Sequence, residues 1–324
     1  MNRAMPPEAR IYVAGHRGMV GGALLRCLQS AGYRQILTRT HAELDLLDQA
    51  AVRDFMQSEW PEYVFLAAAR VGGIVANSSY PAEFIHQNLL IQANVIHEAW
   101  RARVKRLLFL GSSCIYPRDC PQPMKEEYLL SGPLESTNRP YALAKIAGIE
   151  MCWAYNRQYQ TRFLAAMPTN LYGPADNYDL EQSHVIPALI RKVHEAKASG
   201  AGQVVVWGSG SPRREFLFSD DAADACLFLM NLPDEKFELF FASHSHPPLV
   251  NVGCGEDLTI RELVDLVKEV VGYTGQVVWD AGRPDGTPRK LLDMHWLRSL
   301  GWQPRIGLAD GLQRAYVDFL ANHP

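Results

Sequence analysis

The segment Ile11-Tyr-Val-Ala-Gly15-His-Arg-Gly18-Met-Val-Gly21 decides the fold, because an apolar run leads there into a glycine-rich turn that opens a helix. Small residues let the backbone approach a pyrophosphate, and a helix N-terminus favours its negative charge. The spacing is Gly-x-x-Gly-x-x-Gly, not the commoner Gly-x-Gly-x-x-Gly, and the alternative is a tight strand-to-helix turn without a ligand. We expect a dinucleotide to contact Gly15, His16, Arg17, Gly18, Met19, Val20 and Gly21.

Short β-rich runs alternate with helical stretches on both sides of this turn. The pattern predicts strands at 10–14, 35–38, 63–67, 106–110 and 163–167, and helices at 19–31, 49–59, 82–101 and 140–160. Such alternation is typical of a parallel sheet with helices on both faces. We therefore expect an α/β fold with a Rossmann-like, doubly wound parallel sheet.

The alternation loosens after residue 167. A helix at 184–198, a strand at 203–207, a basic turn at 212–214 and a capping box at 259–262 are predicted there. We expect a cofactor domain at 1–170, to which the chain returns near 217–253. Residues 171–324 should form mainly a smaller α/β domain for the substrate.

Composition limits the partners of the chain. The 324 residues are 48% hydrophobic, and 32 Lys and Arg residues balance 35 Asp and Glu residues without a basic block. This balance argues against nucleic acid or an anionic membrane as a partner. The sequence shows no signal peptide and no membrane span, and its six cysteines form no Cys-x-x-Cys pair. We expect a cytoplasmic protein without a bound metal.

The end of the second predicted strand bears on the type of dinucleotide. Enzymes that prefer NAD usually carry an acidic residue there for the ribose hydroxyls. This chain has Leu37-Thr-Arg39-Thr-His41 instead, and Arg17 lies in the glycine turn. Two arginines can bind a 2′-phosphate, with His41 only partly charged at pH 7, so NADP is predicted.

A tyrosine and a lysine four residues apart, Tyr141 and Lys145, share one face at the start of a predicted helix. A phenol with a pKa near ~10 exchanges protons poorly at neutral pH, and a neighbouring ammonium group is expected to lower that pKa. Ser112 follows the fourth strand, where open α/β sheets bind ligands. The three side chains should hold a carbonyl oxygen of a substrate. The alternative is a Tyr/Lys pair that makes an ordinary surface contact.

Together these motifs resemble the extended short-chain dehydrogenase/reductase family, and within it the bifunctional epimerase/reductases that act on GDP-linked keto-deoxysugars. The similarity extends over almost the whole chain, in the segments 14–21, 67–77, 111–117, 140–148, 167–174, 183–189, 206–210 and 284–290.

The resemblance implies a chemistry in which one ketone supports two reactions. A ketone at sugar carbon 4 acidifies the hydrogens on carbons 3 and 5, so the same oxygen site serves epimerisation and reduction. The family uses a Cys and a His as the acid/base pair, and these match Cys114 and His184. Their ordinary pKa values, near ~8.5 and ~6.5, suit proton transfer at neutral pH. Cys114 as base and His184 as acid is the favoured assignment, but the reverse stays open.

The resemblance also implies further binding residues and an assembly. For the substrate these are Lys192, Trp207, Arg214 and Asp285; for the cofactor they are Leu110, Gly111, Ser112, Ser113, Tyr141, Lys145, Pro168, Thr169, Asn170, Leu171 and His184. A homodimer through the helices at 82–101 and 140–160 is expected.

Two other functions fit parts of the pattern. A sugar-nucleotide 4-epimerase or dehydratase would keep Tyr141 and Lys145 without needing Cys114 and His184, and it would hold NAD tightly. A cofactor-sensing protein without catalysis usually lacks the tyrosine or the lysine. Net consumption of NADPH separates the epimerase/reductase from both.

Overall fold

A six-stranded parallel sheet forms the centre of the computed structural model, which describes residues 4–180, 182–243, 245–282 and 285–323. Its strand order is β10-β5-β4-β3-β1-β2, and every neighbouring pair is parallel. The strands are β1 (Ile11–Ala14), β2 (Ile36–Leu37), β3 (Tyr63–Leu66), β4 (Arg106–Leu110), β5 (Phe163–Pro168) and β10 (Leu249–Val252).

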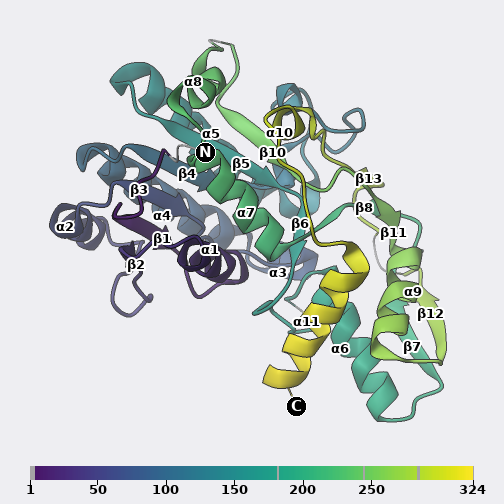
Figure 1. The fold of residues 1–324 in the computed structure, drawn as a ribbon. Helices are drawn as coiled ribbons and strands as arrows, with labels where there is room; N and C mark the ends of the chain where they lie inside the picture. The colour runs from purple at the N-terminus through teal and green to yellow at the C-terminus, as the bar shows by residue number, and fades with distance from the viewer. Residues whose placement is uncertain (1–3, 181, 244, 283–284, 324) are drawn as a thin grey trace.

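Helices cover both faces of this sheet (Figure 1). On one face α1 (Met19–Ser30) packs against α7 (Ser219–Met230). On the other face α4 (Pro81–Arg101) contacts both α2 (Gln49–Glu59) and α5 (Arg139–Tyr159). The predicted doubly wound α/β fold is therefore confirmed.

Local sequence explains where several of these helices begin. The Asp48 carboxylate accepts from the backbone N–H groups of Ala50 and Ala51 and so caps α2. Pro81 and Pro140 lie in the first turns of α4 and α5, where a missing N–H removes no helical hydrogen bond. The order of the strands in the sheet reverses direction between β1 and β3. Open α/β sheets bind ligands at the carboxyl ends of the strands beside such a switch point.

Beyond β5 the chain builds three small sheets. β6 (Asn170–Tyr172) pairs with β9 (Phe216–Phe218), and β7 (Gln203–Trp207) pairs with β12 (Gln276–Asp280). The expected basic turn at 212–214 is wrong: Arg213 and Arg214 form β8, the middle strand between β11 (Leu258–Thr259) and β13 (Arg289–Lys290). Backbone pairing from two distant segments stabilises an extended conformation that the local sequence did not indicate.

The helices of this second part are α6 (Val185–Ala198), α9 (Ile260–Val271) and α11 (Leu308–Asn322). The predicted capping box is confirmed, since the Thr259 side chain accepts from Glu262 N and the Glu262 carboxylate accepts from Thr259 N. The short elements are α3 (Ile74–Ser79), α8 (Asp234–Phe237), α10 (His295–Ser299) and the 3₁₀ turns η1 (Ser113–Ile115), η2 (Glu126–Tyr128), η3 (Ser136–Asn138) and η4 (Glu238–Phe241).

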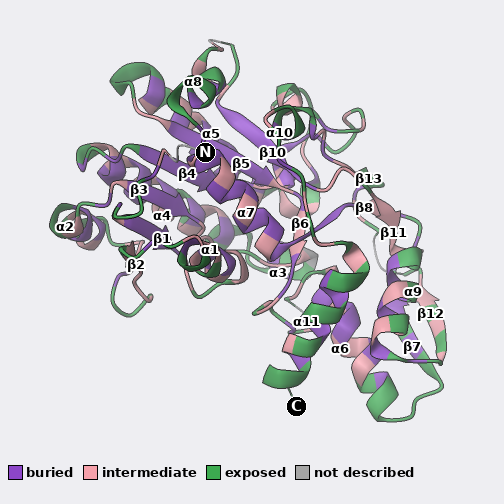
Figure 2. Cartoon of the chain, viewed as in Figure 1, coloured by how far each residue is buried: buried purple, intermediate pink, exposed green. Residues whose placement is uncertain are grey.

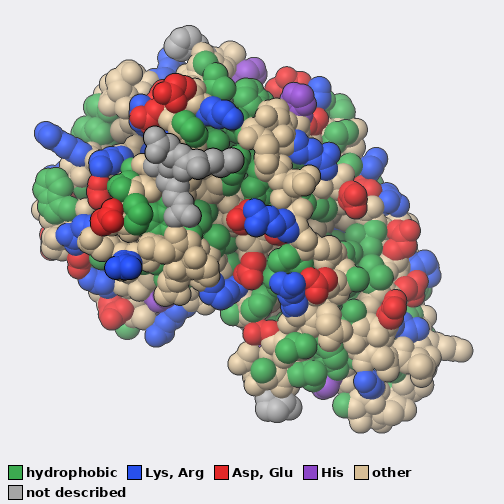
Figure 3. All heavy atoms as spheres, in the orientation of Figure 1, with side chains coloured by type: hydrophobic (Ala, Val, Ile, Leu, Met, Phe, Trp, Pro, Cys, Tyr) green, Lys and Arg blue, Asp and Glu red, His purple; other side chains and the backbone are tan. Residues whose placement is uncertain are grey.

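Two apolar cores hold the chain together, and their buried strands and helix faces are visible in Figure 2. The larger core surrounds the six-stranded sheet, and the smaller one lies between α6, α9, α11 and the β7/β12 pair. On the face drawn in Figure 3, positive and negative side chains are interspersed. Among the described residues, no helix combines the length and apolar character that crossing a membrane requires.

Candidate active site

The turn after β1 is shaped as a cradle for a pyrophosphate. Gly15 has φ +87°, and a Cβ atom there would lie 2.7 Å from Ala68 N, just past β3. A Cβ atom on Gly21 would collide with the Gly15 carbonyl. The first turn of α1 starts at Gly18 without a side-chain cap, and His16 Nδ1 is buried without a hydrogen-bond partner in the described structure. These features fit a dinucleotide whose phosphates meet the free N–H groups of α1.

The structure separates the three cations predicted for the 2′-phosphate. Arg39 Nη2 lies 2.5 Å from Glu59 Oε1, and Arg39 Nη1 donates to Thr38 O, so Arg39 is already engaged. His41 is exposed and lies 3.6 Å from Asp45. Arg17 is exposed in the glycine turn. Hydrogen bonds from Thr40, with the charges of Arg39 and Arg17, lower the pKa of the nearby Glu43 carboxyl. Arg17 is thus the predicted arginine that is most accessible to a phosphate.

Ser112 and Tyr141 meet at the carboxyl end of β4. The Ser112 side chain hydrogen-bonds the Tyr141 hydroxyl group, and Phe84 supports the Tyr141 ring edge-on at 6.3 Å. Burial raises the pKa of the Tyr141 phenol; the Cys114 thiol adds to this, and the Ser112 hydrogen bond opposes it. This direction is opposite to the expected lowering by Lys145. The raised pKa keeps the phenol protonated, which is the form that can donate a proton to a substrate oxygen.

Lys145 lies one helical turn below Tyr141 and is buried. Its Nζ donates to Leu110 O at 2.7 Å and lies 4.7 Å from the centre of the Phe109 ring and 5.9 Å from that of Tyr141. Burial lowers the pKa of this ammonium group to about 7. Lys145 therefore changes charge near neutral pH, which explains why it does not lower the pKa of Tyr141 in the free protein.

Cys114 lies beside the same two residues, in the 3₁₀ turn η1. The Ser112 side chain accepts from Cys114 N at 3.3 Å. Two side chains that the sequence analysis missed reach the sulfur: Asn138 Nδ2 at 3.0 Å and Lys290 Nζ at 3.6 Å. They come from the start of α5 and from β13, and only the folded chain brings them together.

His184 lies at the N-cap position of α6, but its side chain makes no capping hydrogen bond. Burial among surrounding protein atoms, helped by the positive charge of Lys290, lowers the pKa of its imidazole. Its solvent-accessible surface is nevertheless large, which is typical of a group that lines a cleft. The backbone of its neighbour Ser183 touches the Gly73 turn, where a Cβ atom would lie 2.5 Å from Ser183 O. Lys290 thus contacts the Cys114 sulfur, and its charge also acts on His184.

The predicted substrate residues form two contacting groups, Arg214 with Asp285 and Lys192 with Trp207. Arg214 Nη2 donates to Asp285 O at 3.3 Å. Burial lowers the pKa of the Arg214 guanidinium, whereas the negative charges of Cys114 and Asp285 act to raise it. The Asp285 carboxylate accepts from Ser209 N and Oγ, both at 2.8 Å, and so fixes the turn after Trp207. Lys192 Nζ lies 4.4 Å from the centre of the Trp207 ring.

Arg213, next to Arg214 on β8, faces a different partner. Its Nε donates to Asp257 Oδ1 at 3.0 Å, and Arg289 Nε holds the other oxygen of that carboxylate at 2.5 Å. Asp257 therefore joins β8, β11 and β13 on one side, while Arg214 and Lys290 extend toward the cleft. Arg213 has a structural role that the sequence analysis did not identify.

The remaining predicted cofactor residues lie along the carboxyl edge of the sheet. Leu110 ends β4, Gly111 and Ser113 follow it, and Pro168 ends β5. Thr169 Oγ1 and Asn170 Nδ2 both donate to Glu215 O, at 3.2 and 2.9 Å, and Leu171 pairs with Leu217.

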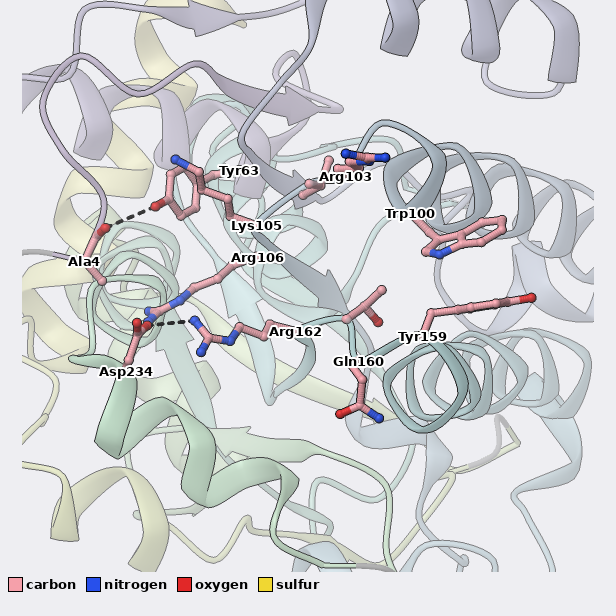
Figure 4. A pocket seen from close by; sticks show the side chains of 12 residues that line it. Ala4, Tyr63, Trp100, Arg103, Lys105, Arg106, Tyr159, Gln160, Arg162 and Asp234 are labelled. Atoms are coloured by element: carbon pink, nitrogen blue, oxygen red, sulfur yellow. Dashed lines mark hydrogen bonds and ion pairs between the residues drawn. The ribbon is translucent and has the colours of Figure 1, made fainter.

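A separate cavity of about 470 Å³ opens at the opposite, amino end of the strands (Figure 4). Its cations Arg106 and Arg162 both bind Asp234 Oδ1, at 2.5 and 2.9 Å. None of the predicted site residues lines it. The cleft around Cys114 and Tyr141 is therefore the candidate active site.

The fold and the site define a Rossmann-type enzyme that binds a dinucleotide and activates a carbonyl group. The model of the family described as "NAD dependent epimerase/dehydratase family" matches residues 11–252, and the chain belongs to this family. The family prediction is confirmed.

Relatives are similar over almost their full lengths. A "Putative GDP-L-fucose synthase 2" of Arabidopsis thaliana is 58% identical over 97% of this chain and 93% of its own. The "GDP-L-fucose synthase" of Escherichia coli (strain K12) is 55% identical over 97% and 98%. A solved structure, a GDP-mannoheptose C4 reductase from Campylobacter jejuni with NADP bound, is 38% identical with a TM-score of 0.87 and covers 98% and 100% of the two chains.

Proposed function

We propose that this protein is a bifunctional epimerase/reductase that converts GDP-4-keto-6-deoxy-D-mannose to GDP-L-fucose. It epimerises carbons 3 and 5 and then reduces the 4-keto group with NADPH. The observation that carries the proposal is the position of Cys114 beside the Ser112/Tyr141 oxygen site, with Lys290 Nζ 3.6 Å from the Cys114 sulfur. The names of the relatives at 58% and 55% identity support the substrate.

The oxygen site serves both reactions. When a proton leaves carbon 3 or 5, charge moves to the carbonyl oxygen at carbon 4. The Tyr141 hydroxyl and the Ser112 hydroxyl then donate to that oxygen, inside a site where buried donors act strongly. This places the sugar with carbons 3 and 5 toward Cys114 and His184.

Cys114 removes the proton and His184 supplies one on the opposite face. Asn138 and Lys290 bring an N–H donor and a positive charge to the Cys114 sulfur, and these contacts orient the sulfur toward the sugar. The lowered pKa of His184 makes its protonated form a stronger acid but leaves the imidazole mainly neutral at pH 7, so His184 must take up a proton before it acts as the acid. Single substitutions of Cys114 and of His184 test the opposite assignment. Only the substitution of the residue that acts as the base abolishes exchange of substrate hydrogen with solvent.

Bound NADPH supplies the hydride for the reduction. The cradle at 15–21 would hold its phosphates, and Arg17 would bind the 2′-phosphate. Lys145, next to Tyr141, would bind the nicotinamide ribose. Tyr141, which burial keeps protonated, donates its proton to the oxygen at carbon 4.

The GDP portion binds along the rim of the cleft. Arg214 and Lys192 bind the diphosphate, and Trp207 and Asp285 shape the site for the nucleoside. Residues 1–170 form the cofactor domain, with a return near 217–253, and residues 171–324 mainly form the substrate domain. This arrangement places the reacting sugar between the two.

The enzyme is a cytoplasmic homodimer that pairs through α4 and α5. Leu89 and Leu143 are 36% and 39% exposed on these two helices, which lie against each other. Light scattering should give twice the mass of the chain, and Leu143→Glu should shift the protein toward the monomer. A monomeric wild type would contradict the dimer.

A reductase that acts without epimerisation is the second candidate, favoured by the C4 reductase among the solved structures. Incubation with GDP-4-keto-6-deoxy-D-mannose and NADPH, followed by NMR of the sugar, separates the two. GDP-L-fucose as product supports the proposal, whereas a product with unchanged configuration at carbons 3 and 5 supports the reductase.

A further inference from the structure

We infer that Asn138 is a positioning residue for Cys114, and that its side-chain amide holds the sulfur in its reactive orientation. The inference rests on the proposed function for its catalytic consequence, although the state of the thiol can be measured without any sugar substrate. The main observation is the Nδ2 donor of Asn138 at 3.0 Å from Cys114 Sγ.

The turn that carries Asn138 is built to place it. Glu135 is buried, and its carboxylate accepts from Thr137 N at 3.3 Å, which caps the 3₁₀ turn η3. Burial of Glu135 favours the neutral carboxyl, but the Thr137 N–H and the charge of Arg118 outweigh burial and lower its pKa. Thr287, ahead of β13, also reaches Glu135, at 3.5 Å. One carboxylate thus fixes both the Asn138 turn and the segment that leads to Lys290.

Asn138 occupies the N-cap position of α5, but its side chain does not cap that helix. Asn at this position usually accepts from a backbone N–H of the first turn. Here Nδ2 faces Cys114, and Oδ1 is buried without a hydrogen-bond partner among the described residues. The side-chain amide of Asn138 therefore donates to the Cys114 sulfur and does not cap α5.

Two side chains contact the sulfur. The amide N–H of Asn138 donates to the sulfur at 3.0 Å, and the Lys290 ammonium group lies 3.6 Å from it. The Ser112 side chain, which accepts from Cys114 N, fixes the backbone of the residue. Asn138 is thus the neutral donor to the sulfur, and Lys290 is the second side chain that contacts it.

The variant Asn138→Asp tests this role because Asp has the shape of Asn and is an equally good N-cap residue. It replaces the N–H donor with a carboxylate that repels the thiolate. We expect the rate at which iodoacetamide alkylates Cys114 at pH 7, followed on the Cys114 peptide by mass spectrometry, to fall about tenfold. Asn138→Ala should reduce it less, since no charge is added. Ser131→Ala, an exposed position in the preceding loop whose hydroxyl donates to Tyr128 O, is the control and should stay within twofold.

Two further readouts distinguish positioning from a general structural effect. Deuterium exchange into the sugar should fall by a similar factor in Asn138→Asp, while oxidation of GDP-L-fucose by NADP⁺, which needs no thiol, should stay within threefold. Wild-type alkylation rates in Asn138→Asp, with an unchanged Tm, would overturn the inference. Slower alkylation in the variant, with no exchange even in the wild type, would instead support the positioning role and refute the proposed function.

Discussion

Lys145 Nζ lies 2.7 Å from the backbone oxygen of Leu110, so the first turns of α5 are tied to the end of β4 by a buried ammonium group. This hydrogen bond joins α5, which carries Tyr141, to the end of β4, which leads directly to Ser112. Because burial lowers the pKa of Lys145 to about 7, the bond is charged only near or below neutral pH in the free protein.

The first prediction concerns stability against pH. The unfolded chain keeps Lys145 protonated up to pH ~10, so between pH 7 and 9 it binds more protons than the folded chain. The contribution of Lys145 to the free energy of unfolding should therefore rise from pH 7 to 9, by on the order of 2 kcal/mol. Urea unfolding of wild type and Lys145→Met at both pH values measures it. A stability difference between the two proteins that does not change with pH would contradict the lowered pKa.

The second prediction compares two adjacent arginines of β8. Arg214→Met removes a cation from the cleft and should raise the KM for the GDP-sugar at least tenfold, with little change in Tm. Arg213→Met breaks the contact with Asp257 and should lower Tm while KM rises less than threefold. Steady-state kinetics and thermal unfolding of both variants provide the comparison. Equal effects on KM would show that the two side chains do not have separate roles.

The third prediction concerns the close packing of α5 on the sheet. A Cβ atom on Gly148 would lie 2.5 Å from Phe109 Cζ and 2.8 Å from Gln92 Oε1. Gly148→Ala should therefore cost about 1–3 kcal/mol of the free energy of unfolding and weaken NADPH binding, because Phe109 supports Lys145. Gly202→Ala, where no atom lies within 4 Å, is the control and should change stability by less than about 0.5 kcal/mol. An unaltered Gly148→Ala protein would refute the packing argument.

The fourth prediction concerns cofactor choice. Arg17→Ala should reduce the preference for NADPH over NADH about tenfold, because its guanidinium is accessible to the 2′-phosphate. Arg39→Ala should reduce the preference less, because Arg39 pairs with Glu59. The ratio of kcat/KM values for the two cofactors is the measurement. A larger effect at Arg39 would mean that its ion pair opens when the cofactor binds.

Sequence patterns with a short range were reliable guides to this fold. The glycine turn, the alternating strands and helices, and the Pro140 helix start depend on neighbours in the chain, and the structure has them where they were expected. Ser112, Tyr141 and Cys114 converge because the motif that carries each one lies at the carboxyl edge of the sheet.

Features that depend on distant segments were not predictable in the same way. Asn138 and Lys290 meet at Cys114 from positions far apart in the chain; Asn138 belongs to no motif, and Lys290 ends the 284–290 segment without a role that the segment indicates. The separate roles of Arg213 and Arg214 require the pairing of β8 with β11 and β13. The raised pKa of Tyr141 reflects burial, which a sequence motif does not report.

The central claim is that Cys114 makes the enzyme an epimerase as well as a reductase. The most direct test incubates GDP-4-keto-6-deoxy-D-mannose with NADPH in deuterated water, using wild type and Cys114→Ser, and locates deuterium by NMR. We predict deuterium at carbons 3 and 5 with wild type, and with Cys114→Ser at least a hundredfold less, while the variant still oxidises GDP-L-fucose with NADP⁺. Reduction by the wild type without deuterium at either carbon would contradict the account.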